Sequence, residues 1–173
     1  MRIVILKNSE EIGEWTAAYV AEKINKANPT PEKPFVLGLP TGSSPIPAYR
    51  HMVRLYKEGK VSFRNVVTFN MDEYVGLSEE HPESYHYFMR HHLFDHIDIP
   101  RENVNILNGN ATDLEAECKR FEARIQSLGG VDLFIGGIGP DGPIAFNEPR
   151  SSLNSPTRVK NLRYDTTYEQ HTS

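Results

Sequence analysis

The 173-residue chain contains one cysteine, Cys118, so no disulfide can form within it. It also lacks an excess of positive charge: a net charge of -4 disfavours a protein that binds nucleic acid or anionic lipid. No run of about 18 apolar residues is present, so no membrane-spanning helix is expected. The apolar N-terminal residues 1–6 are too few for a secretory signal. Together these absences predict a soluble, cytoplasmic protein.

Apolar residues are also scarce at the end of the chain. The composition as a whole, with 38% hydrophobic and 24% charged residues, is typical of a globular protein, and the length fits one domain. Residues 150–173, however, contain only five members of the hydrophobic set. A domain of this size normally ends on an element that packs against the core, so this polar tail is unusual.

Strand-like and helix-like patterns alternate along the rest of the chain. Short apolar runs predict strands at residues 1–7, 34–39, 66–71, 104–107 and 131–137. Capping residues predict helix starts at Asn8, Ser44 and Thr112, and a further helix is expected over about 83–96. This alternation predicts an α/β fold: an open, mostly parallel sheet with helices on both faces (Rossmann-like).

In open α/β sheets, ligands bind beyond the carboxyl ends of the strands, and three loops there are unusual. The first is Thr41-Gly42-Ser43-Ser44, which leads from a strand into a helix. Its glycine, its hydroxyls and the unpaired N–H groups of the helix make it a candidate phosphate cradle. A simple helix cap explains Ser44 equally well. The loop is not a Walker motif, because it lacks the lysine and the spacing.

The second loop begins with Asp72 and Glu73, directly after the strand predicted at 66–71. A carboxylate at the end of an apolar strand is partly desolvated, which raises its pKa and suits it to take a proton from carbon. The alternative is that either side chain only caps a turn or lies in solvent. Taken alone, an acidic pair favours this second interpretation.

The third loop contains GIGPDG at 137–142, which matches the GxGxxG dinucleotide fingerprint letter by letter. A dinucleotide site fits poorly, because Pro143 and Pro149 leave room for only about one and a half helical turns. We therefore interpret the glycines as shaping a pocket that presents Asp141 and Glu148.

Four histidines fall on the helix expected over 83–96: His86, His91, His92 and His96. His92 and His96 are four residues apart, as metal ligands on a helix can be. No cysteine lies near them in the sequence, and the spacing is not HExxH. We therefore predict an exposed polar helix face and no metal site.

Read in order, seven segments resemble glucosamine-6-phosphate deaminase: FVLGLPTGSSP, VVTFNMDEYVGL, EEHPESYHYFM, LNGNATDLEAEC, LFIGGIGPDG, IAFNEP and SSLNSPTRVK. The resemblance implies that residues 1–166 are the N-terminal part of a single deaminase-like domain. Residues 167–173 are then a divergent tail, and the C-terminal part of the family domain is missing. The related phosphogluconolactonases share a similar fold, but their sequences do not match FNMDEYVG.

The resemblance implies an activity in amino-sugar catabolism: glucosamine 6-phosphate and water become fructose 6-phosphate and ammonia, without a cofactor. Asp72 is then the base that takes the C2 proton of the open-chain sugar and returns it at C1. Asp141 and Glu148 serve ring opening, and residues 41–44 hold the sugar phosphate. Family enzymes are usually homo-oligomers, often hexamers. Many bind N-acetylglucosamine 6-phosphate as an allosteric activator at positions that match Ser151, Arg158 and Lys160.

Two substitutions depart from the family pattern. Pro143 stands where the family has the histidine of ring opening, and proline has no group that carries a proton. Pro156 replaces an arginine just before Arg158, which speaks against an unchanged effector site. Two hypotheses follow. The chain is a deaminase of impaired activity, or it is a non-catalytic sugar-phosphate-binding or regulatory subunit of a full-length deaminase.

Overall fold

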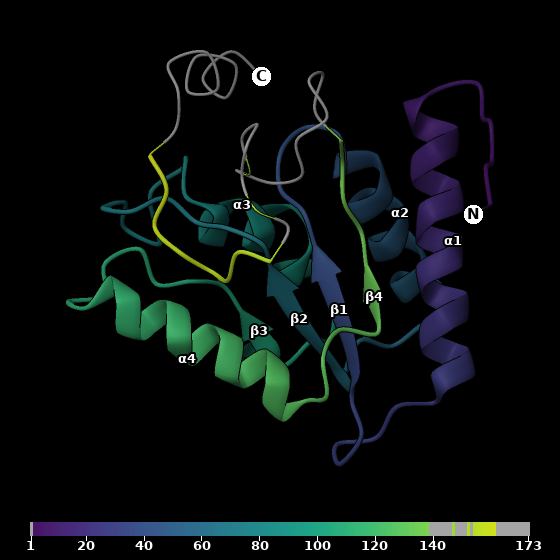
Figure 1. Cartoon of the computed structure of the whole chain (residues 1–173). Helices are drawn as coiled ribbons and strands as arrows, with labels where there is room; N and C mark the ends of the chain where they lie inside the picture. The colour runs from purple at the N-terminus through teal and green to yellow at the C-terminus, as the bar shows by residue number, and fades with distance from the viewer. Residues whose placement is uncertain (1, 139–146, 148–151, 153, 162–173) are drawn as a thin grey trace.

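The computed structural model describes residues 2–138, 147, 152 and 154–161 (Figure 1). In these residues, four strands form one parallel sheet in the order β3-β2-β1-β4. The strands are β1 Phe35–Leu39, β2 Val66–Asn70, β3 Val104–Asn105 and β4 Leu133–Phe134. Leu39 pairs with Asn70, so β1 and β2 end at the same edge of the sheet. The predicted open parallel α/β sheet is confirmed.

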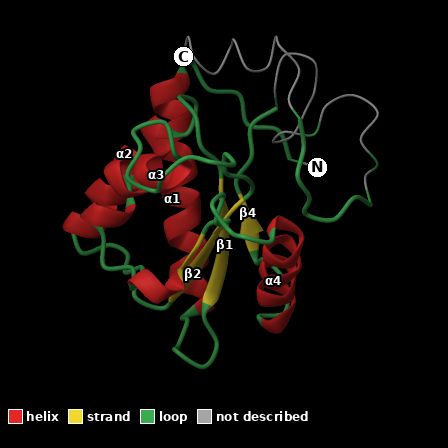
Figure 2. Cartoon of the chain, turned by 90° about the vertical axis from the view of Figure 1, so that its left-hand side faces the viewer, coloured by secondary structure: helices red, strands yellow, loops and turns green. Residues whose placement is uncertain are grey.

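Helices cover both faces of this sheet, as Figure 2 shows. On one face lie α1 (Ser9–Ala27), α2 (Ile46–Lys57) and α3 (Tyr85–His92), and on the other lies α4 (Leu114–Ser127). Short 3-10 turns follow α3 (η1, Phe94–His96) and precede β3 (η2, Arg101–Asn103). No helix in the described part of the chain is long and apolar enough to cross a membrane.

The two faces of β1 and β2 supply two cores. On the α1–α3 side, Leu37 and Leu39 are fully buried against residues such as Tyr49 of α2 and Met89 of α3. On the α4 side, the smaller core is formed by Val36, Val67, Phe69 and Phe121. Both strands are buried along their whole length, which is why they read as continuous apolar runs.

Residues 2–6 do not form the strand predicted at 1–7. They run beside α1, and Ile3 and Ile5 are 72% and 90% exposed (Figure 1). An apolar run becomes a strand only where an open sheet edge offers hydrogen-bond partners to its backbone. Apolarity predicts burial, but it does not supply such an edge, and the prediction was wrong for this reason.

Element boundaries also differ from the prediction in several places. The Asn8 cap is confirmed, because its Oδ1 accepts the Glu11 N–H at 2.9 Å. The cap of α4 is Asp113 rather than Thr112, and Pro45 rather than Ser44 stands at the N-cap of α2, without a side-chain hydrogen bond. At α4, Thr112 and Asp113 are both of the capping type, so the pattern leaves that cap uncertain by one residue. At α2, the N-cap is a proline, a residue that suits the start of a helix but offers no side-chain hydrogen bond.

Gly13 of α1 lies close against the start of α2. A Cβ placed on this residue lies 2.5 Å from the Pro47 Cβ and 2.8 Å from the Ala48 nitrogen. Only the absence of a side chain at Gly13 lets the two helices meet at this distance.

We expect Gly13→Ala to lower the free energy of unfolding by about 1–3 kcal/mol, because the added methyl group overpacks the contact. The direction of this change tests the packing, because in a helix without such a contact alanine is more stable than glycine by about 1 kcal/mol. Glu22→Ala, on an exposed position of the same helix, is the control and should change stability by less than about 0.5 kcal/mol. Urea denaturation measures both, and a Gly13→Ala variant as stable as the parent chain contradicts the packing described here.

Candidate active site

The candidate site lies where β1 and β2 end. The Asn70 side-chain amide donates to the Leu39 carbonyl at 2.9 Å and joins the two strand ends. Beyond them is a cavity of about 500 Å³, lined by residues 69–75, 107–109 and 155–161 and by one face of α4. A cavity of this volume falls in the range of small-molecule sites in proteins.

Asp72 lines this cavity and follows β2 by two residues. Burial of the carboxyl, and to a smaller extent the charge of Glu73, raises the pKa of Asp72 to about 7. This agrees with the desolvated strand-end carboxylate expected from the sequence. Near neutral pH such a group can both accept and return a proton, which is the property that a general base needs.

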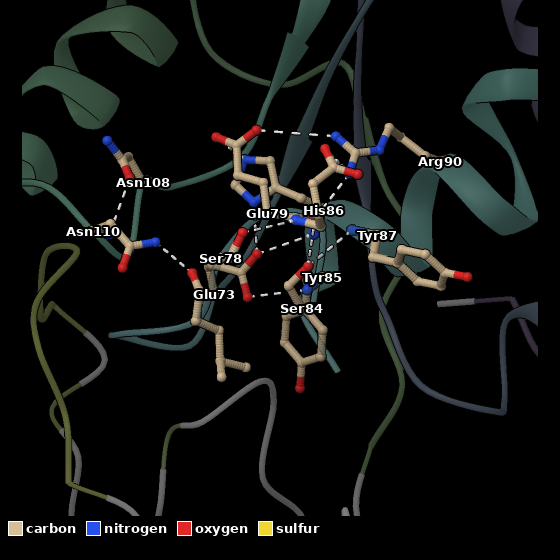
Figure 3. Close-up of polar contacts among 12 residues, drawn as sticks. Glu73, Ser78, Glu79, Ser84, Tyr85, His86, Tyr87, Arg90, Asn108 and Asn110 are labelled. Carbon is tan, nitrogen blue, oxygen red and sulfur yellow. Dashed lines mark hydrogen bonds and ion pairs between the residues drawn. The ribbon is translucent and has the colours of Figure 1, made fainter. Parts of the chain in front are cut away.

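Glu73, the next residue in the sequence, is surrounded by hydrogen-bond donors (Figure 3). Its side chain is only 3% exposed. Oε1 accepts the N–H groups of Tyr74 at 2.8 Å and Tyr85 at 3.0 Å, while Oε2 lies 3.0 Å from the His86 nitrogen and 2.7 Å from His86 Nδ1. Burial raises the pKa of Glu73, but these hydrogen bonds outweigh burial and lower the pKa overall. Glu73 is therefore ionised at neutral pH.

Tyr74 and Tyr85 form the next contact around Asp72. Their rings lie 5.0 Å apart and their hydroxyl oxygens 3.5 Å apart, and Tyr85 also forms a side-chain hydrogen bond with Thr41. Burial, followed by the charge of Asp72, raises the pKa of Tyr85, so its hydroxyl stays protonated. Tyr85 thus connects the loop after β1 with the loop after β2. This role of Tyr85 was not predicted from the sequence, although its place at the start of the helix after the acidic loop was a usable signal.

The loop 41–44 lies at the predicted edge of the sheet, but its cradle differs from the expected one. Thr41 is partly buried, whereas Gly42, with a φ of 94°, and the two serines are exposed. The first turn of α2 cannot offer a full set of free N–H groups, because Pro45 and Pro47 have none and Ile46 donates to the Ser43 carbonyl at 3.3 Å. Binding of an anion at this loop would therefore rely more on the side-chain hydroxyls, and less on backbone N–H groups, than the sequence predicts.

A third loop supports the acidic loop from the side. The Gly76 N–H donates to the Gly109 carbonyl at 3.0 Å, and the Asn110 side chain bonds to the Leu77 carbonyl. A Cβ on Gly109 would lie 2.0 Å from the Tyr74 carbonyl oxygen. The backbone that carries Asp72 and Tyr74 is therefore packed directly against a residue without a side chain.

Arg158 and Lys160, the predicted effector residues, are exposed and line the same cavity as Asp72. Their segment is attached to α4, because the Thr157 N–H and hydroxyl both donate to Glu122 Oε1, at 2.9 and 2.6 Å. Arg158 also donates to Asn147 Oδ1 at 3.3 Å. The other predicted site residues, Asp141, Glu148 and Ser151, lie outside the described residues, as does Pro143.

The four histidines do not share one exposed face, contrary to the sequence interpretation. His86 points toward Glu73 and is only 15% exposed at its side chain, whereas His91 and His96 are exposed. The prediction failed for His86 because the buried carboxylate that partners it comes from another loop. Within the described ranges, no group of three or more histidine, cysteine or acidic residues is arranged to hold a metal.

Comparison with known proteins assigns this arrangement to a family. The family model for glucosamine-6-phosphate isomerases/6-phosphogluconolactonase matches residues 7–151. The chain belongs to this family. The glucosamine-6-phosphate deaminases of Phocaeicola vulgatus and Parabacteroides distasonis are each 66% identical to it over 166 residues, or 96% of this chain. The chain spans 63% and 62% of the lengths of these two relatives.

Solved structures agree with this assignment. A monomeric glucosamine-6-phosphate deaminase is 41% identical, superimposes with a TM-score of 0.91, and covers 98% of this chain, which in turn covers 68% of that protein. A 6-phosphogluconolactonase from Thermotoga maritima superimposes with a TM-score of 0.62 and is 23% identical. The match covers 83% of this chain and 63% of that protein, and it shows a shared fold alone.

The raised pKa of Asp72 predicts a pH effect on stability. The native value of about 7 lies above the ordinary value of 3.8, so the native state holds this proton more tightly than the unfolded state. The free energy of unfolding should therefore decrease as the pH rises from about 4 to about 7, with a contribution from Asp72 of up to about 4 kcal/mol.

Urea denaturation of Asp72→Asn at several pH values measures this contribution, because asparagine removes the titration. We expect the variant to gain stability relative to the parent chain as the pH rises through this window. Glu83→Gln alters an exposed carboxylate of the same β2–α3 connection. In this control, the free energy of unfolding should vary with pH as it does in the parent chain. A difference between Asp72→Asn and the parent chain that stays constant from pH 4 to pH 7 contradicts the raised pKa.

Proposed function

We propose that this chain acts on glucosamine 6-phosphate as its relatives' names indicate, converting it with water to fructose 6-phosphate and ammonia. The observation that carries the proposal is the Asp72 carboxyl, which has a pKa of about 7 on the wall of a cavity of about 500 Å³. The 66% identity to two glucosamine-6-phosphate deaminases supports the choice of substrate.

In this mechanism Asp72 takes the C2 proton of the open-chain amino sugar. The electron pair of the broken C–H bond forms the C1–C2 double bond, and the carbonyl oxygen at C1 takes up a proton. Asp72 then returns its proton at C1, and the nitrogen electron pair forms an iminium at C2. Water adds to C2, ammonia leaves, and the ketose results. A carboxyl that is half ionised near neutral pH fits both proton transfers.

The remaining roles belong to the same proposal. The hydroxyls of the loop 41–44 hold the sugar phosphate, with Thr41 oriented by Tyr85. Asp141 and Glu148 serve ring opening. Ser151, Arg158 and Lys160 bind an N-acetylglucosamine 6-phosphate effector, for which the two exposed cations offer suitable charge. Residues 1–166 act as one deaminase-like unit of a cytoplasmic homo-oligomer, with 167–173 as its tail.

A second candidate function is a non-catalytic subunit that binds the sugar phosphate and modulates a catalytic partner. Pro143 is the specific observation in its favour, because it replaces the histidine that the resemblance places at ring opening. Proline can neither accept nor donate a proton with its side chain. The two candidates share the phosphate loop and differ in whether ammonia is released.

Ammonia release from glucosamine 6-phosphate distinguishes them. We expect the 173-residue chain to be slow and Pro143→His to be faster by about 10²-fold or more, because a general acid–base group is worth about 10²–10⁴-fold in the step it serves. Asp72→Asn in the Pro143→His background should abolish the gain. Pro31→His, which adds a histidine at an exposed position before β1, is the control and should leave the rate unchanged.

Calorimetric titration with fructose 6-phosphate completes the test. Binding without any ammonia release, even in Pro143→His, supports the second candidate. A chain that neither binds fructose 6-phosphate nor releases ammonia overturns both.

A further inference from the structure

Glu73 lies beside the proposed base, but it cannot act on a substrate itself. Both of its carboxylate oxygens already accept two hydrogen bonds each, and its side chain is 3% exposed. A buried carboxylate with four donors is held in one orientation, since any rotation would leave buried N–H groups unsatisfied. Its contribution to the site must therefore come from where it is held and from its charge.

The start of α3 holds Glu73 in place. Two of its four donors are the N–H groups of Tyr85 and His86, the first two residues of the helix, while the N-cap Ser84 accepts the N–H of Tyr87 at 3.1 Å. These are N–H groups that a helix cannot satisfy internally, and a negative charge at this end is stabilised by the helix dipole. A residue 12 positions earlier in the chain thus completes the capping of α3.

His86 extends this contact toward the surface (Figure 3). Its Nδ1 lies 2.7 Å from Glu73, and its Nε2 lies 3.5 Å from Glu79. Arg90 is in turn 4.0 Å from Glu79 and 3.0 Å from Glu80. Because an ionised carboxylate only accepts hydrogen bonds, His86 must carry its proton on Nδ1. The buried carboxylate is thereby connected through His86 to the exposed ion pairs of Arg90 with Glu79 and Glu80.

We propose that Glu73 is a positioning residue for Asp72: pinned by the start of α3 and by His86, it fixes the backbone of residues 71–74 and places a permanent negative charge beside the base. This inference rests on the proposed function, since Asp72 is the base only there. The permanent charge disfavours ionisation of Asp72 and so adds to the larger effect of burial on this carboxyl. Of the two adjacent carboxylates, one is fixed as an anion and the other is left free to exchange its proton.

The experiment is a carbon-detected NMR titration of the side-chain carboxyl groups in the free protein. We expect Glu73→Gln to lower the pKa of Asp72 by about one unit or more, because the substitution removes a neighbouring charge. Glu83→Gln, an exposed position of the same connection, is the matched control and should leave the Asp72 titration in place. The other ionisable groups around Asp72 remain unchanged in both variants. They are Tyr85 and, lining the cavity, Tyr74, Glu117, Cys118, Glu122, Arg158 and Lys160.

His86→Gln is the second variant and serves if Glu73→Gln does not fold. It weakens the strongest hydrogen bond that keeps Glu73 ionised, so the Glu73 titration should move up toward that of Asp72 in the same spectra. The proposal is overturned if Asp72 titrates unchanged in a folded Glu73→Gln, or if the Glu73 titration does not move in His86→Gln.

The titration requires no substrate, so it separates this proposal from the proposed function. If the chain releases no ammonia but the pKa of Asp72 falls in Glu73→Gln, the role of Glu73 as a positioning residue stands. Only the proposed deaminase activity is then refuted. If ammonia is released, the acidic limb of kcat/KM in Glu73→Gln should move to lower pH together with the Asp72 titration. A purely structural role for Glu73 would lower the rate at all pH values without moving this limb.

Discussion

The parallel pairing of β1 and β2 is the constraint on which the rest of this molecule depends. Their five-residue ladder, from Phe35↔Val66 to Leu39↔Asn70, is buried on both faces and divides the interior into two cores. Because the strands run in register to a common end, the two loops that follow them emerge side by side. The hydroxyl-rich loop and the acidic loop meet through Tyr85 for this reason, and the acidic loop lines the cavity.

At that edge, two consecutive carboxyl groups acquire opposite properties. Asp72 is removed from water, and chiefly for this reason its pKa rises to about 7. Glu73 is also removed from water, yet its four hydrogen bonds lower its pKa. Burial alone therefore does not decide the protonation of a carboxyl group, and the direction depends on whether the backbone and side chains nearby supply donors.

Much of this could be predicted from the sequence, and three of the features that could not be predicted have a common cause. Local signals located the central strands and the Asn8 cap, and they indicated a desolvated carboxylate at Asp72. They failed for the segment 2–6, which needed a sheet edge, and for His86, whose partner Glu73 is 13 residues away. Tyr85 was missed because its contact with Thr41 joins two loops. Each of these three failures concerns an interaction between segments that are separated in sequence, which periodicity and spacing do not encode.

The contact between Gly109 and Tyr74 has a consequence for how this site can be altered. Any side chain at position 109 would have to displace the Tyr74 carbonyl, since even a methyl group would lie 2.0 Å from it. The backbone of Tyr74 is continuous with that of Asp72. A substitution at Gly109, which carries no reacting group, would therefore displace the proposed base through the backbone. Engineering a new specificity into this cavity therefore has more freedom on the α4 side than on the loop that supports residues 74–76.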